Sequence, residues 1–181
     1  AFIAELLNTK GGHNCGDLFL KLFIDQQLEN QLKYINIPSS FYNRLKPFKT
    51  QGSIAKVEHH LGFKSNNSTE GGRIDLILND ELGNHILFEN KINADDQLGQ
   101  LISYHNAFKA APIFYLSKFP KDPDPKSQSN LKKGEEFVCI TYQDDILKWL
   151  EACVEKTFDR PTIRETIIQY IHLVRNLTNQ N

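Results

Sequence analysis

The sequence predicts a single α/β domain in which helices flank a mixed central β-sheet, and three observations predict it. The chain has 181 residues, which suits one compact domain over residues 1–181. Helical and strand-like apolar patterns follow one another in the order αα-βββ-α-ββ-αα. Polar turns separate the first three strand-like runs, as expected of hairpin connections. Such an order is typical of a sheet that helices cover.

Two helices are expected at the N-terminus. Residues 1–8 form the first, and a polar stretch then breaks it. Asn14 can cap a second helix that runs to about residue 30. Its apolar residues at helical spacing are Leu18, Phe19, Leu22 and Phe23. Residues 31–52 contain prolines and a glycine and are expected to be irregular.

The remaining elements follow from the same patterns. Strands are expected over residues 54–63, 73–78, 85–92, 113–116 and 137–142. A helix is expected over residues 95–109, with Leu98, Leu101, Ile102 and Phe108 on its apolar side. Residues 118–136 are a polar loop. Two helices, over about 144–157 and from Pro161 to about 177, close the chain.

Charge and cysteine content narrow the functional classes. The formal net charge is −1, so attraction to a nucleic acid would have to be local or assisted by a metal. Cys15, Cys139 and Cys153 lack the spacings of a disulfide framework or a zinc site. We expect free thiols, buried at Cys139 and Cys153, and a reducing cytoplasm. No apolar run approaches the length of a membrane span, so no membrane partner is expected.

Charged residues interrupt two of the strand patterns. In residues 73–78, Ile74, Leu76 and Leu78 are expected on one face and Asp75 on the other. In residues 85–92, Glu89 and Lys91 are expected side by side on the face opposite Asn90. If the two strands pair, Asp75 and Glu89 converge at the same end of the sheet.

Two close carboxylates repel each other, and a divalent cation resolves that repulsion. Ligation by oxygen atoms alone suits Mg²⁺ or Mn²⁺. A lysine beside such a site can polarise a water and stabilise developing negative charge. The competing interpretation is an Asp at a strand edge and a Glu–Lys ion pair on a solvated face, and these residues alone leave both open.

A longer string resembles a known family. Asp75 followed by Glu89, Asn90 and Lys91 looks like the D…(D/E)-x-K signature of the PD-(D/E)XK nuclease superfamily. The string GGRIDLILND…HILFENKINADDQLGQLISYHNAF resembles the GRID…IENK-I…DQ…QL..Y pattern of a bacterial family within it. The N-terminal and C-terminal segments are also similar, so the resemblance covers nearly the whole chain. One departure is that Ile74, and not proline, precedes Asp75.

The resemblance implies a restriction-endonuclease-like core of αβββαβ topology. It implies that Asp75, Glu89 and the backbone carbonyl of Asn90 ligate Mg²⁺ or Mn²⁺, and that Lys91 assists the attacking water. The implied reaction is phosphodiester hydrolysis by in-line displacement. Because Lys91 looks like a strand-face lysine with little packing, we expect its removal to stop cleavage while the fold survives.

Further residues are weaker candidates. Glu58 could be another metal-site carboxylate, as the resemblance suggests, or part of a solvated face. Gln97, Gln100 and Tyr104 share one face of the helix after Lys91 and match the DQ..QL..Y pattern. We expect Gln100 near the carboxylates, with Gln97 or Tyr104 at the rim. Asp17 matches an acid on the superfamily's first core helix, but an acid in a first helical turn is also favourable for dipole reasons.

The function expected is a metal-dependent nuclease, an endonuclease or exonuclease acting on DNA in preference to RNA, in a bacterial restriction, defence or repair setting. The alternative is a catalytically silent nucleic-acid-binding or regulatory module with the same fold. A third interpretation is an effector domain of a larger defence system. A homodimer and a larger defence complex both stay open as assemblies.

Overall fold

A computed structural model describes residues 2–33, 40–64 and 69–180 of the chain. The strands are β1 (Ile54–Gly62), β2 (Gly72–Asn79), β3 (His85–Lys91), β4 (Ile113–Ser117) and β5 (Phe137–Thr141). The α-helices are α1 (Phe2–Leu7), α2 (Leu18–Lys33), α3 (Ser40–Leu45), α4 (Gln100–Ala107), α5 (Pro125–Gln128), α6 (Leu147–Glu155) and α7 (Pro161–Leu177). One turn of π-helix, η1 (Tyr142–Ile146), joins β5 to α6.

The five strands form one mixed sheet in the order β1-β2-β3-β4-β5. The pairs β1–β2 and β2–β3 are antiparallel, as the polar turns between them predicted. The pairs β3–β4 and β4–β5 are parallel, and α4 lies in the connection between β3 and β4. The predicted mixed α/β sheet flanked by helices is therefore confirmed.

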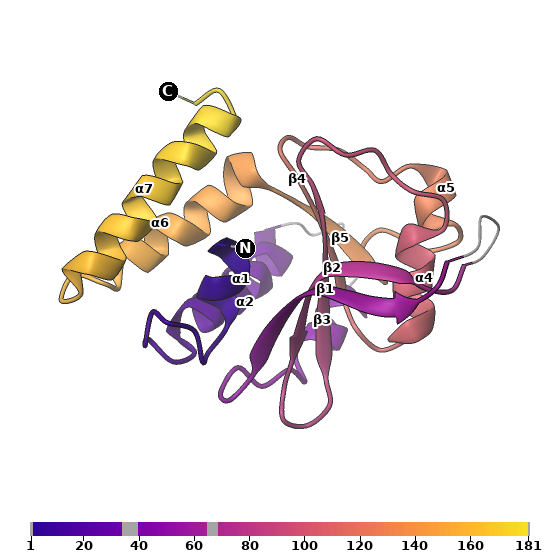
Figure 1. The fold of residues 1–181 in the computed structure, drawn as a ribbon, viewed down its shortest axis with the longest axis horizontal. Helices are drawn as coiled ribbons and strands as arrows, with labels where there is room; N and C mark the ends of the chain where they lie inside the picture. The colour runs from indigo at the N-terminus through magenta and orange to yellow at the C-terminus, as the bar shows by residue number, and fades with distance from the viewer. Residues whose placement is uncertain (1, 34–39, 65–68, 181) are drawn as a thin grey trace.

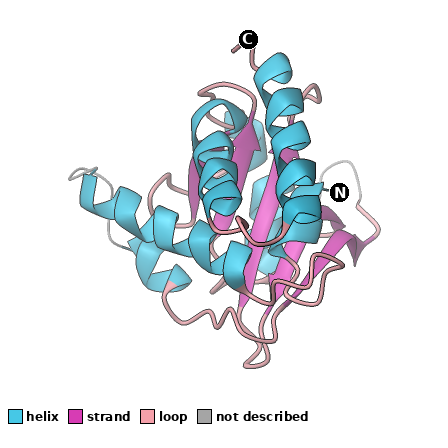
Figure 2. Cartoon of the chain, turned by 90° about the vertical axis from the view of Figure 1, so that its left-hand side faces the viewer, coloured by secondary structure: helices cyan, strands magenta, loops and turns pink. Residues whose placement is uncertain are grey.

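Each face of the sheet has its own apolar core. On one face, α1, α2, α6 and α7 cover a large aromatic cluster in which Phe23 contacts Phe88, Phe114 and Trp149 (Figures 1 and 2). On the other face, α4 covers a smaller cluster of strand residues (Figure 1). The two faces of β3 therefore meet different helices, and side chains that alternate along β3 enter different surroundings.

The helix predicted over residues 95–109 is shorter in the structure, because it begins only at Gln100. Gly99, in the left-handed conformation with φ 62°, precedes the helix. Asp96 is held outside the helix, since its carboxylate accepts hydrogen bonds from the Tyr115 hydroxyl and the Asp124 backbone N–H. The prediction that Leu98 packs on the sheet is wrong: this residue is 50 % exposed.

Short helices occur where the sequence predicted none. Helix α3 lies within the stretch expected to be irregular, and α5 lies within the polar loop, where the Asp124 side chain caps it. The Cys153 thiol is buried as expected, whereas Cys139 is only partly buried beside Asp122. Within the described parts of the chain, no helix has the length and apolar character needed to cross a membrane.

Candidate active site

Strand β3 presents three polar residues in a row at its C-terminal end. Glu89 and Lys91 point to the face that α4 covers, where Leu87 joins the smaller core. Asn90 lies between them on the opposite face, which Ile86 and Phe88 share. The predicted alternation along β3 is confirmed, because the pleat of a strand sends successive side chains to opposite faces.

Glu89 and Lys91 form a buried ion pair. Lys91 Nζ lies 2.7 Å from Glu89 Oε1, and the two side chains are 5 % and 2 % exposed respectively. The ammonium also donates to the Asp95 carbonyl at 3.1 Å and to Gln100 Oε1 at 2.9 Å. Three acceptors thus match the three N–H donors of the lysine and fix its position.

Helix α4 supplies the other partners of this pair. Gln100 accepts from Lys91 and donates through Nε2 to the Tyr104 hydroxyl at 3.2 Å. The Tyr104 hydroxyl oxygen lies 2.5 Å from Glu89 Oε2, and also 2.5 Å from the Arg73 carbonyl. Its single proton can serve only one of these two acceptors at a time. Glu89 is therefore held between Lys91 on one oxygen and Tyr104 on the other.

Tyr104 is at the centre of the network, with no exposed surface, and not at its rim. Gln97 is exposed and lies before the helix, and its backbone N–H is 3.4 Å from Gln100 Oε1. Gln100 was expected near the carboxylates, and the structure places its side chain against Lys91, the ion-pair partner of Glu89.

Asp75 lies where β2 and β3 separate. The β2–β3 pairing ends at Leu76 and Phe88, and the backbone N–H of Asn90 donates to Asp75 Oδ2 at 2.8 Å. The predicted face pattern of β2 is wrong at this point, because Ile74 joins the smaller core and not the core of Leu76. The alternation breaks at Asp75, a partly buried residue at this opening.

Glu58 on β1 lies opposite this break, since the flanking pairs are Val57 with Leu76 and His59 with Ile74. Its backbone has a positive φ of 53°, and its exposed carboxylate lies 3.4 Å from Arg73 Nη1. Glu58 thus lies opposite Asp75 on the neighbouring strand, but its carboxylate forms an ion pair with Arg73. Its role as a metal ligand stays a prediction.

Asp17 has a contact elsewhere in the fold. It lies just before α2, and its carbonyl accepts the first hydrogen bond of that helix, from the Lys21 N–H. Its Oδ2 accepts a hydrogen bond from the Thr50 hydroxyl at 2.5 Å, and Thr50 lies in the segment that leads into β1. These contacts give Asp17 a role in joining α2 to the start of the sheet.

Opposing electrostatic effects act on Glu89, and together they place its pKa above the ordinary value of a glutamate. Burial raises the pKa of Glu89, and the nearby charge of Asp75 raises it further, against the opposing effects of Lys91 and Tyr104. Burial and the Glu89 charge also raise the pKa of the Tyr104 hydroxyl, which stays protonated as a donor. The negative charge of Asp75 disfavours ionisation of Glu89, and a bound cation would offset that effect.

The opposite face of β3 holds a second polar group beside Asp75. Tyr142 forms side-chain hydrogen bonds with Asn90 and with Tyr170 of α7. A cavity of about 80 Å³ lies here, lined in part by Asp75, Asn90, Tyr142 and Tyr170. Asn90 is thereby held from the side opposite to the Glu89–Lys91 pair.

Sequence reasoning missed three residues near the site. Asp96 fixes the segment whose Asp95 carbonyl binds Lys91, and Tyr142 holds Asn90 from η1. Lys64 interacts electrostatically with both Glu89 and Lys91. For Asp96, a second acid directly before Gln97 was a visible signal. Lys64 and Tyr142 are distant in sequence from the other site residues, and no sequence pattern indicated them.

The donor set fits a small hard cation better than a zinc ion. Asp75, Glu89 and the Asn90 carbonyl are all oxygen donors, and Mg²⁺ commonly uses one or two carboxylates and several waters. Across residues 2–33, 40–64 and 69–180, no group of three or more His, Cys, Asp or Glu side chains is arranged to hold a metal. Any ion here would therefore need the Asn90 carbonyl and water in addition to the two carboxylates.

A comparison with protein families gives a match over most of the chain. The family model of the PD-(D/E)XK nuclease superfamily matches residues 1–172. Neither a curated protein nor a solved structure matches the chain significantly.

Proposed function

The chain belongs to the PD-(D/E)XK nuclease superfamily, and on that premise we propose that it is a Mg²⁺- or Mn²⁺-dependent nuclease that hydrolyses phosphodiester bonds of DNA. One observation carries the proposal. The buried Lys91–Glu89 pair is held in place by Gln100 and Tyr104, beside Asp75 at the opening between β2 and β3. Burial of charged groups costs free energy, and ionisable groups that are buried with specific charge partners are typical of functional sites.

In this proposal, Asp75, Glu89 and the Asn90 carbonyl hold the ion, which when bound supplies positive charge near the scissile phosphate. Glu89 has both oxygens engaged, by Lys91 and Tyr104. Each carboxylate oxygen has a second lone pair, so Glu89 keeps acceptor capacity for an ion while both contacts are in place. The Tyr104 hydroxyl has an alternative acceptor in the Arg73 carbonyl, so it can release Glu89 without losing its hydrogen bond.

Lys91 would then act on the reacting atoms. Its ammonium leaves one of its three acceptors and donates to the attacking water or to a phosphate oxygen, where it offsets developing negative charge. The water oxygen forms a bond to phosphorus and gives a proton to solvent, and the bond to the leaving oxygen breaks on the opposite side. The leaving oxygen takes up a proton from solvent. Gln100 and the Asp95 carbonyl keep the lysine aimed during this step.

The setting that we propose is a cytoplasmic bacterial restriction, defence or repair system, with the protein acting alone, as a homodimer or within a larger complex. One observation favours the alternative of a silent nucleic-acid-binding module, namely that each Glu89 oxygen already has a protein partner. A measurement of catalytic turnover distinguishes a nuclease from a silent binding module.

The test incubates the protein with plasmid, linear duplex and single-stranded DNA, and with RNA, in Mg²⁺, Mn²⁺ or EDTA. We expect DNA cleavage in either metal, none in EDTA, and none by Glu89→Ala. Glu155→Gln, an exposed acid on α6, is the matched control and should cleave like the wild type. Binding without cleavage under every condition would support the silent module instead.

A further inference from the structure

A second lysine approaches the site from the β1–β2 hairpin. Lys64 follows β1 directly after Gly62 and Phe63, and it is partly buried. A side-chain carbon added at Gly72, the first residue of β2, would lie 3.6 Å from Lys64 Cδ. The stem of Lys64 therefore runs over Gly72, and the next residue, Arg73, contributes the carbonyl that lies beside Tyr104.

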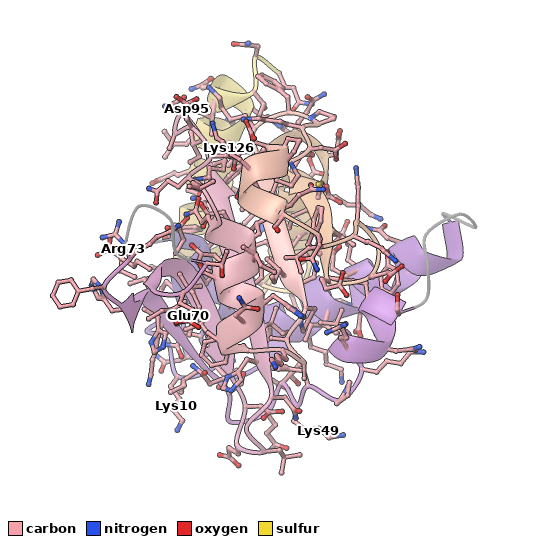
Figure 3. All side chains as sticks on the ribbon, turned by 90° about the vertical axis from the view of Figure 1, so that its right-hand side faces the viewer. Lys10, Lys49, Glu70, Arg73, Asp95 and Lys126 are labelled. Carbon is pink, nitrogen blue, oxygen red and sulfur yellow. The ribbon has the colours of Figure 1, made fainter. Side chains whose placement is uncertain are left out.

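The glycine pair at the start of β2 makes this approach possible. Gly71 has a φ of 74°, and a side chain there would collide with the carbonyl of Phe63. The two chain segments of the hairpin come closer here than residues with a Cβ allow. Figure 3 shows Glu70 and Arg73, which flank this glycine pair, at the side of helix α4.

Glu89 attracts the Lys64 ammonium without forming an ion pair with it. Within the described residues, its ammonium has no ion-pair partner, whereas Arg73 beside it pairs with Glu58. Burial lowers the pKa of Lys64, attraction to Glu89 opposes this shift, and repulsion from Lys91 adds to it. A partly buried cation without a counter-ion is a favourable place for an anion.

We propose, on the basis of the nuclease function argued above, that Lys64 binds a phosphate oxygen of the DNA backbone beside the scissile bond. Glu89 and Lys91 pair with each other, whereas Lys64 forms no ion pair with any residue that the structure describes and can meet an incoming phosphate. Lys64 is a substrate-binding residue in this assignment, and its loss affects affinity more than the chemical step. The site also gains local positive charge in a chain whose net charge is −1.

The test measures binding of a fluorescently labelled short DNA duplex by anisotropy in EDTA, over a series of salt concentrations. For Lys64→Gln we expect Kd to rise roughly tenfold at low salt, and the slope of log K against log salt to become shallower by about 0.9, the value for one lost phosphate contact. Lys64→Arg should restore both. Lys56→Gln makes the same charge change at an exposed position of the same hairpin, and should leave the slope unchanged.

Two results would overturn the assignment. Lys64→Gln could match Lys56→Gln in Kd and slope, which would remove the phosphate contact. Alternatively, it could lower kcat with Kd and slope unchanged, which would mean that Lys64 acts only on Glu89 and Lys91. Wild-type protein that neither binds nor cleaves DNA would instead reject the nuclease proposal itself, and this assignment with it. Thermal melts of each variant confirm that the fold is retained.

Discussion

Lys91 Nζ lies 2.7 Å from Glu89 Oε1, and both side chains are almost completely buried. The strand pattern predicted that the two residues are neighbours on one face, but it did not predict their burial. The ion pair is enclosed because α4 lies over this end of β3 and closes it from solvent. Each partner consequently depends on the other for its charge to be tolerated in the interior.

Removal of Lys91 should therefore lower stability as well as activity. The expectation that Lys91 is a strand-face lysine with little packing is wrong, since the lysine is 6 % exposed and has three acceptors. Lys91→Met leaves Glu89 buried without its cation, and should lower the free energy of unfolding by about 3–5 kcal/mol. Denaturant titration measures this, and the double variant with Glu89→Gln should recover part of the loss. An unchanged midpoint for Lys91→Met would contradict the argument.

Lys91→Met should also slow cleavage. Removal of one preorganised donor to the transition state commonly costs about 3–4 kcal/mol of barrier, or roughly 10²–10³ in rate. The comparison is made by plasmid cleavage at a temperature where the variant is folded. Calorimetric titration with Mn²⁺ should still detect an ion, because Asp75 and Glu89 remain. A folded variant that cleaves at the wild-type rate would remove the lysine from the mechanism.

Tyr104→Phe tests the other contact of Glu89. The variant keeps the packing of the ring but removes the hydroxyl that lies against Glu89 Oε2. We expect a loss of about 1–2 kcal/mol in unfolding free energy, and cleavage slower by roughly tenfold because Glu89 loses a positioning contact. Tyr115→Phe, which removes a hydroxyl bonded to Asp96, is the matched control. It should cost similar stability with a smaller change in rate.

Binding of the metal should stabilise the fold. An ion that binds only the native state at 100 times its Kd adds about 2.7 kcal/mol. We expect Mn²⁺ to raise Tm for the wild type relative to EDTA, with the increase abolished in Asp75→Asn and Glu89→Ala. Glu155→Gln controls for general effects of charge. Equal increases in all four proteins would place the ion outside this site.

Asp80, in the turn between β2 and β3, should make the free energy of unfolding depend on pH. Burial opposes ionisation, but hydrogen bonds from Asn84, Lys49 and Leu82 outweigh it and lower the pKa of Asp80 below 3.8. A carboxylate whose pKa is lowered on folding adds stability above its unfolded pKa, and this contribution disappears as pH falls through the folded value.

Asp80→Asn replaces one acceptor oxygen by an amide nitrogen that cannot accept. We expect it to lower the free energy of unfolding by about 1–3 kcal/mol at pH 7. The difference from the wild type should shrink as pH falls below about 4, where the wild-type carboxylate begins to protonate in the unfolded state. Urea titrations at several pH values measure it. A difference that stays constant with pH would show that the charge of Asp80 has no part in it.

Much of the architecture followed from local patterns. The alternation along residues 85–91 placed Glu89 and Lys91 on one face and Asn90 on the other, because the pleat of a strand is fixed by backbone geometry. Polar turns gave the two antiparallel pairs. Where the backbone leaves the regular pleat, at Glu58 and Asp75, the same reasoning failed and put Ile74 on the wrong face.

By itself, the sequence determined the five strands, the mixed sheet and the face that Glu89 and Lys91 share, since each depends on periodicity or on short spacing. Only the tertiary structure decided that Tyr104 lies against Glu89, that Asp96 stays outside α4, and that Lys64 lies near enough to interact with Glu89 and Lys91. The first contact joins α4 to β3, and the second joins the segment before α4 to β4. The third relates the end of β1 to β3. Long-range packing sets such distances, and no local pattern of residues encodes it.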